Sequence, residues 1–275
     1  LGDVYKRQSH LLAPYIDNYW EFKGNPEYGM RIHILPDGCT DFIFTLGEVA
    51  NAVEEGSLIM QPYRSYFVGP MTKYSELVTY TESIHMFGVR FLPCGLSCFT
   101  NLPLHEFVNS RVSTNEMKAV FDDTFIEKLG EQKHVTDRIR VVEEYLLAYL
   151  ARHYQPADSH VAMAVNMINH SKGKRSVRSL MDDVCLCPRH FERKFKHYTG
   201  FTPKEYSRIV KFKNAVELLR TTTSANLLTT AVDAGYYDLA HFSKEIKSMS
   251  GNTPASFLSL TVPEETTLTY IEPQR

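Results

Sequence analysis

The sequence predicts an α+β protein of two parts: a β-rich N-terminal barrel or sandwich with following helices, and an all-helical C-terminal domain. Up to about residue 91 the apolar residues recur mostly at every second position, as they do in half-buried strands. From Pro93 onward the period is helical. The length of 275 residues is about twice that of a typical domain, which agrees with two parts.

Two strands carry the alternating pattern most clearly. Their shared apolar faces are Phe42, Phe44 and Leu46 in 41–46, and Phe87, Val89 and Phe91 in 86–91. Asp41 and Arg90 lie opposite these faces, where they either line a pocket or pair with each other, and we expect the pair. The Pro36-Asp37-Gly38 segment is typical of a turn between strands.

The boundary between the two parts is expected after a helix from Asp137 to His153, for which Asp137 is the expected N-cap. The Pro-containing segment 155–159 follows, so the predicted domains are 9–155 and 159–260. The first eight residues resemble a translated sequencing adapter, so we expect the fold to begin after them and the natural N-terminus to be missing.

Composition excludes several classes of protein. With 43% hydrophobic, 12% aromatic and 23% charged residues, the chain is neither disordered nor a coiled coil. No apolar run approaches the roughly 18 residues that a membrane span needs, and no secretory leader opens the chain, so no membrane partner is expected. The odd number of five cysteines favours reduced thiols and a cytoplasmic location.

The net charge of −2 conceals an asymmetry along the chain. Residues 1–155 contain 14 Lys and Arg against 20 Asp and Glu, whereas residues 170–260 contain 15 against 8. A basic C-terminal part favours a polyanionic partner, although a solvated basic face is the commoner meaning of such a pattern.

The C-terminal part contains an internal repeat. The segment from His190 to Tyr206 recurs 51 residues later, from His241 to Phe257, and eight positions match in type. Each copy reads as a short helix, a tight turn and a second helix, with Gly200 and Gly251 ending the second helices. These are two helix-turn-helix units, and a helix from Pro203 to about Leu219 would hold their outer helices about 34 Å apart, one DNA turn.

The 234–257 segment, Ala-Gly-Tyr-Tyr-Asp-Leu-Ala-His-Phe-Ser-Lys followed by Gly251-x-Thr253-Pro254-x-x-Phe257, resembles the signature of the arabinose-regulator (AraC/XylS) family of bacterial transcription factors. The resemblance covers about 100 residues. It implies a seven-helix double helix-turn-helix domain that binds double-stranded DNA, with RNA polymerase as a further partner of an activator. The residues it places against DNA are Arg189, Glu192, Arg193 and Lys196 in the first unit, and Leu239, Ala240, His241 and Lys244 in the second. His190, beside the core residue Phe191, is a further candidate for a DNA contact.

The sequence departs from the family pattern at the second unit. Tyr236 stands where a Gly-Phe pair is usual, and Leu239 and Ala240 offer no hydrogen bonds. We therefore expect base readout from the first unit, with apolar and phosphate contacts from the second. His241 occupies the same position of the repeat as His190, and for His190 helix packing competes with a phosphate contact.

The N-terminal part resembles an uncharacterised β-rich domain found ahead of such DNA-binding domains, through 35–41 (Leu-Pro-Asp-Gly-Cys-Thr-Asp) and 88–93 (Gly-Val-Arg-Phe-x-Pro) among other pieces. This resemblance implies a cupin-like sensor or oligomerisation domain, hence a small-molecule effector or a homodimer. The candidate ligand-pocket residues are His33, Asp41 and Arg90.

The chain is thus expected to be a regulator rather than an enzyme, with no cofactor, metal or catalytic residue. The alternative is a cupin-like metalloenzyme with an appended helical DNA-binding domain, which would use His33, Asp37, Asp41 and His85 to bind iron. A zinc site at Cys185, Cys187 and His190 is not expected, because one intervening residue and no second cysteine pair cannot close a tetrahedral site.

Overall fold

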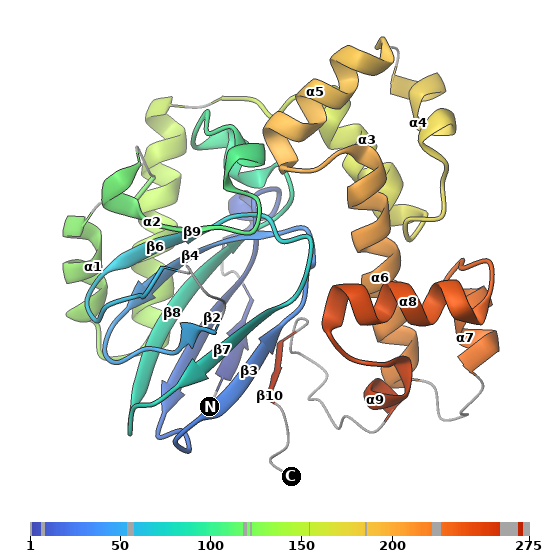
Figure 1. Ribbon diagram of the computed structural model, residues 1–275. Coiled ribbons are helices and arrows are strands. Elements are labelled where there is room, and N and C mark those ends of the chain that lie inside the picture. The colour runs from blue at the N-terminus through green and yellow to red at the C-terminus, as the bar shows by residue number, and fades with distance from the viewer. Residues whose placement is uncertain are drawn as a thin grey trace.

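The computed structural model describes residues 2–6, 9–53, 58–117, 120–121, 123–153, 155–184, 186–221, 227–258 and 269–271. It has a β-rich part with helices on one side, and a second group of helices beside it (Figure 1). This arrangement confirms the predicted α+β class. No helix in the described ranges is long and apolar enough to cross a membrane.

The β-rich part contains two antiparallel sheets. The six-stranded sheet has the order β1 (Gly2–Tyr5), β2 (Ile16–Gly24), β8 (Ile84–Phe91), β4 (Thr40–Thr45), β6 (Ser65–Val68) and β9 (Arg111–Ser113). The four-stranded sheet has the order β10 (Thr269–Ile271), β3 (Met30–Ile34), β7 (Ser75–Thr79) and β5 (Asn51–Ala52). The described strands form a sandwich rather than a closed barrel, which decides between the two predicted forms.

Both ends of the chain contribute strands that the sequence did not indicate. β1 lies within the first eight residues, where no fold element was expected, and it pairs with β2 so that Tyr5 is opposite Tyr19. β10 lies beyond the predicted C-terminal domain and pairs with β3. An edge strand presents unpaired backbone N–H and C=O groups, and a further strand pairs with them through its own backbone. Because this pairing depends little on side chains, the sequence pattern did not indicate β1 and β10.

The six-stranded sheet is buried on both faces. Phe42, Phe44 and Phe87 belong to one apolar cluster, which includes residues of helices α1 (Asp123–Gly130) and α2 (Val135–His153). Ile43 and Met86 belong to another, which includes residues of β3 and β7. The part therefore has three layers. Short 3-10 helices lie in the connections: η1 (His10–Leu12) between β1 and β2, η2 (Gly95–Cys98) and η3 (Leu104–Phe107) between β8 and β9, and η4 (Thr114–Glu116) between β9 and α1.

Helix α2 begins before the expected N-cap. It starts at Val135, so Asp137 lies inside the first turn, where its amide donates to the His134 carbonyl at 3.1 Å and its carboxylate pairs with Arg140. The N-cap assignment was therefore wrong, although an acidic residue in the first turn still suits the helix dipole.

Seven helices are described in the C-terminal part, as predicted. They are α3 (Ser159–His170), α4 (Val177–Val184), α5 (Pro188–Thr199), α6 (Pro203–Thr221), α7 (Leu227–Asp233), α8 (Leu239–Ser250) and α9 (Pro254–Leu258). Asp158 caps α3 by accepting hydrogen bonds from the amides of His160 and Val161 at 3.2 and 3.1 Å.

The two parts share an apolar core. The cluster formed by the C-terminal helices includes Leu35 and Cys94 from the sandwich. Gly38, in the turn before β4, has a φ of +89° and lies so close to α6 that a Cβ there would be 2.6 Å from a ring carbon of Tyr206. The Pro-Asp-Gly turn therefore fixes the sandwich against the long helix of the C-terminal part.

Candidate DNA-binding surface

The sequence repeat is also a structural repeat. Helices α4 and α5 form one helix-turn-helix unit, α7 and α8 form the other, and α6 joins them (Figure 1). Gly200 and Gly251 end α5 and α8 with positive φ values of 83° and 75°. Their amides donate to the carbonyls of Lys196 and Lys247, both at 2.9 Å, which is the C-cap that glycine favours.

Helix α5 exposes most of the side chains expected to face DNA. Phe191 and Phe195 are buried one turn apart, and this turns Arg189, Glu192 and Arg193 into solvent. His190 and Lys196 are half-buried at the edges of this face. Two contacts join side chains one turn apart on this face. Arg193 Nη2 lies 3.2 Å from His190 Nδ1, and Lys196 Nζ lies 3.5 Å from Glu192 Oε1.

Helix α8 presents a less polar face. Leu239, Ala240, His241 and Lys244 are all exposed, whereas Phe242 and Ile246 are fully buried. The Asp238 side chain caps the helix by accepting a hydrogen bond from the His241 amide at 2.7 Å. Tyr237, directly before the N-cap Asp238, is 91% exposed, so it lies beside the candidate DNA-contacting residues of α8. It was not among the predicted contacts. Its position next to the N-cap of the second recognition helix was the sequence feature that could have indicated it.

Tyr236 takes the packing role that the usual phenylalanine would have. Its ring is buried, with centroids 5.2 Å from Phe242 and 5.4 Å from His241. Burial raises the pKa of its hydroxyl above the ordinary range, so the side chain stays neutral. The departure from the family pattern at this position therefore preserves the turn between α7 and α8.

An ion pair orients α8 relative to α6. Arg208 Nε and Nη2 donate to the two carboxylate oxygens of Glu245 at 2.8 and 3.1 Å. The hydrogen bond to Glu245 is the main cause that raises the pKa of Arg208. A bidentate pair of this kind constrains orientation more than a single contact does.

The sandwich touches the C-terminal turns of both units. A Cβ added to Gly200 would lie 2.5 Å from a Pro70 ring carbon, and one added to Gly251 would lie 2.6 Å from the Tyr74 ring. Pro70 and Tyr74 belong to the loop between β6 and β7. In Figure 1, α4 and α7 lie on the far side of α5 and α8 from the sandwich, so the N-terminal ends of α5 and α8 point away from it.

The three candidate pocket residues do not form one group. Asp41 and Arg90 pair as expected, with two Arg90 nitrogens 3.0–3.2 Å from the carboxylate oxygens, and Arg90 Nη1 also lies 2.9 Å from Asp37. Burial opposes the charge of Arg90, but the two carboxylates outweigh it and raise its pKa. His33 lies on β3, where it stacks on Tyr74 and approaches Glu76 to 3.6 Å.

The four residues that the metalloenzyme alternative would use to bind iron, His33, Asp37, Asp41 and His85, contact other partners rather than one another. Asp37 and Asp41 bind Arg90, and His85 Nε2 lies 3.0 Å from Glu21. Within the described ranges, no three His, Cys, Asp or Glu side chains are arranged to hold a metal ion. Cys185, part of the zinc site that was not expected, lies outside the described residues.

Comparisons with known proteins agree with this architecture. Residues 180–259 match a family model described as a helix-turn-helix domain, and residues 8–113 match a domain of unknown function, DUF6597. Residues 180–259 therefore form a helix-turn-helix domain. The comparison with curated proteins found no match.

Several solved structures are similar. ToxT from Vibrio cholerae is 10% identical, with a TM-score of 0.52 over 88% of this chain and 98% of that one. The C-terminal domain of AraT from Geobacillus stearothermophilus is 21% identical, with a TM-score of 0.36 over 41% of this chain and 95% of that one. A probable AraC family regulator from Rhodopseudomonas palustris is 20% identical, with a TM-score of 0.34 over 37% and 95%. The likeness to ToxT extends the shared fold to both parts of the chain.

Proposed function

We propose that the chain is a bacterial, cytoplasmic transcription regulator that binds specific double-stranded DNA through both helix-turn-helix units. The observation that carries the proposal is the repeated unit, with the N-terminal ends of α5 and α8 directed away from the sandwich. Recognition helices contact bases mainly through their N-terminal residues. The proposal makes the chain a regulator rather than an enzyme.

The first unit is the candidate for base readout. Arg189 and Arg193 are exposed on α5, and an arginine can donate two hydrogen bonds to guanine O6 and N7 in the major groove. Glu192 suits a cytosine amino group, and Lys196 and His190, at the edges of the face, suit phosphates.

The second unit is the candidate for positioning. Leu239 and Ala240 suit contacts with thymine methyl groups, while His241 and Lys244 suit phosphate contacts. Phosphates occur at every base pair, so a phosphate contact from the exposed Lys244 would strengthen binding to DNA of any sequence.

The sandwich is the candidate regulatory domain, with boundaries near 9–155 for the N-terminal domain and 159–260 for the DNA-binding domain. Because the sandwich touches the ends of both recognition helices, a small molecule or a second copy of the chain bound to it can change their relative placement. For an activator, RNA polymerase is a further partner.

Selection of bound sequences from a random DNA pool by the full chain tests the proposal. The expected product is a site with two recognition elements about 10 base pairs apart, one for each unit. A pool without enrichment, or a single element with unrestricted flanks, would contradict it. Sedimentation of the same protein with and without DNA measures whether one copy or two bind each site.

A further inference from the structure

The segment that leads into the second recognition helix carries an exposed tyrosine. Tyr237 has the largest exposed fraction, 91%, among the large hydrophobic side chains of the described residues. It lies between the buried Tyr236 and Asp238, the N-cap of α8. Its ring is therefore no part of the core and lies beside the side chains of α8 that are expected to face DNA.

The backbone on both sides of Tyr237 is fixed. On one side the amide of Tyr236 donates to the Ala231 carbonyl at 2.9 Å, which closes the turn after α7. On the other side the Asp238 side chain accepts a hydrogen bond from the His241 amide at 2.7 Å. Because both the turn and the cap are held by hydrogen bonds, the Tyr237 side chain projects from a fixed point of the chain.

Exposed apolar side chains are concentrated in this second unit. The exposed large hydrophobic residues of the described C-terminal part are Met163 on α3, Leu228 and Val232 one turn apart on α7, Tyr237, and Leu239 on α8. Single exposed apolar residues are normal on a protein surface, but a group of them marks a surface that binds another molecule. The second unit therefore has a contact surface that its few polar side chains alone do not explain.

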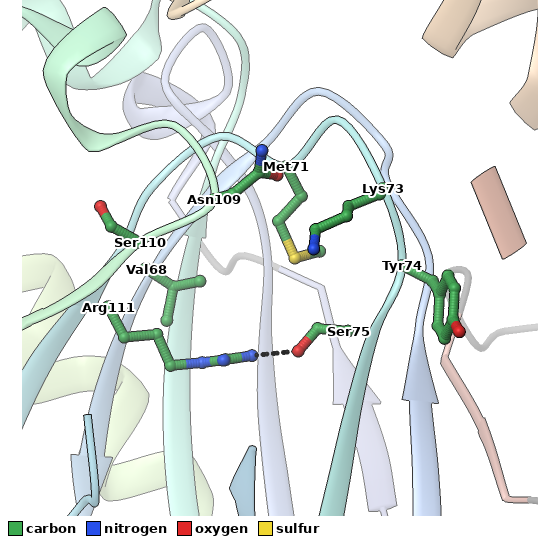
Figure 2. Close-up of a pocket in the computed structure, with 8 residues that line it drawn as sticks. All are labelled: Val68, Met71, Lys73, Tyr74, Ser75, Asn109, Ser110 and Arg111. Carbon is green, nitrogen blue, oxygen red and sulfur yellow. Dashed lines mark hydrogen bonds between the residues drawn. The ribbon is translucent and has the colours of Figure 1, made fainter. Parts of the chain in front are cut away.

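The sandwich determines which way this surface faces. Tyr74, at the edge of the hollow drawn in Figure 2, turns its ring away from the Met71 and Lys73 side chains. That ring packs on Gly251, the C-cap of α8, where a Cβ would be 2.6 Å from a ring carbon. The C-terminal end of α8 therefore lies against the sandwich, and the end that carries Tyr237 points away from it (Figure 1).

The position and chemistry of Tyr237 favour DNA as the partner. The N-terminal residues of a recognition helix enter the major groove, which is bounded by the two sugar-phosphate backbones. Leu239 and Ala240, the first residues of α8, have no side-chain donor, whereas Tyr237 has a hydroxyl, and tyrosine is among the residues that donate to phosphate oxygens. The exposed His241 and Lys244 follow on the same helix as further donors.

We propose that Tyr237 contacts the DNA backbone: its hydroxyl donates a hydrogen bond to a phosphate oxygen, and its ring packs against the adjoining deoxyribose. The inference rests on the proposed function, because it assigns a further contact to the same surface. Tyr237 increases the affinity without adding charge, since a phenol displaces no counterion. It acts with Lys244 to place the second unit on the duplex while the first unit reads the bases.

Equilibrium binding of the full chain to its selected site, measured over a range of salt concentration, tests the contact. Tyr237→Phe removes only the hydroxyl and should weaken binding at least about fivefold, and Tyr237→Ala should weaken it further. In both variants the dependence on salt should keep its wild-type slope, whereas Lys244→Ala should reduce the magnitude of the slope by about one. Tyr28→Phe and Tyr28→Ala, at a 77% exposed residue of the sandwich, are the matched controls and should bind as the wild type does.

Ethylation of single phosphates locates the contact on the DNA. One phosphate of the second recognition element should weaken wild-type binding when it is ethylated and have no such effect on Tyr237→Phe, which has already lost the hydrogen bond. The phosphate bound by Lys244 should weaken the binding of both proteins when ethylated. The profile of selected sequences should be the same for the wild type and Tyr237→Phe, because phosphates carry no sequence information.

Wild-type affinity of Tyr237→Phe would overturn the proposal, and the exposed surface would then belong to a protein partner. A profile that changes at particular base pairs would also overturn it, because the hydroxyl would then contact a base. If the wild type itself does not bind DNA, the proposed function fails. If the wild type binds DNA and only Lys244→Ala is weakened, the proposed function stands and this inference fails.

Discussion

Removal of the Arg193 side chain should alter which DNA sequence is bound without affecting the fold. The side chain is exposed on α5, and its one described contact is with His190 on the same helix. Phe191 and Phe195, on either side of it, are buried and keep it directed into solvent. Because Arg193→Ala removes no core contact, we expect the free energy of unfolding to change by less than about 0.5 kcal/mol.

The expected effect on recognition is much larger. A bidentate contact between arginine and guanine contributes about 1–3 kcal/mol of discrimination against the wrong base, a factor of about 5 to 150. Arg193→Ala should therefore relax the preference at one or two base pairs. The assay is the profile of sequences selected from a random pool at fixed salt, together with thermal unfolding of the same preparation.

Two further variants make the result specific. Lys244→Ala, on the less polar α8, should lower affinity nearly evenly across sequences, as loss of a phosphate contact does. Arg64→Ala, exposed on the sandwich, should change neither the profile nor the affinity. If Arg193→Ala keeps the wild-type profile while Lys244→Ala changes it, the assignment of base readout to the first unit is wrong.

Three other variants test the contact between the sandwich and α6, the buried ion pairs of Arg90, and the N-cap of α3. Gly38→Ala should destabilise the chain by more than the roughly 1–2 kcal/mol cost of a left-handed residue, because its Cβ also meets Tyr206; wild-type stability in urea would contradict this. Arg90→Gln should cost about 3–5 kcal/mol in the same assay, because it leaves two buried carboxylates without their cation, and a loss below 1 kcal/mol would count against it. Burial opposes ionisation of Asp158, but hydrogen bonds from Lys194 and from an amide of α3 outweigh it and lower its pKa. The stability that Asp158 adds over Asp158→Asn should therefore be complete above about pH 4 and disappear as pH falls through the lowered pKa; a difference that persists in acid would refute this.

The C-terminal part was predictable because the same helix-turn-helix pattern occurs twice in its sequence. The matched positions include the buried aromatic residues and the glycines that end each recognition helix, so local rules of capping and periodicity determine the bounds. The helix expected from Pro203 to about Leu219 runs from Pro203 to Thr221. Exposure of the candidate side chains followed from the spacing of Phe191 and Phe195, whereas their contacts with DNA stay predictions.

The N-terminal part was predictable only in outline. Alternation identified strands and correctly placed Asp41 beside Arg90, but it could not decide between barrel and sandwich, because that depends on which distant strands pair. β4 is buried on both faces, so its sequence carries no sign of which layer covers each side. The contacts of Pro70 and Tyr74 with the two repeat glycines join residues more than 100 positions apart, and no local pattern indicates them.

The salt dependence of DNA binding tests the central claim most directly. Two lysines of the candidate surface are assigned to phosphates, the half-buried Lys196 on α5 and the exposed Lys244 on α8. If each neutralises one phosphate, the logarithm of the binding constant should fall with the logarithm of salt concentration with a slope of at least about 1.8 in magnitude, which is a loss of about 12-fold for a fourfold rise in salt. Equilibrium binding of the full chain to its selected site, measured across that range, should give this slope and a value smaller in magnitude by about one for Lys244→Ala. Affinity that does not change with salt would contradict the assignment of this surface to DNA.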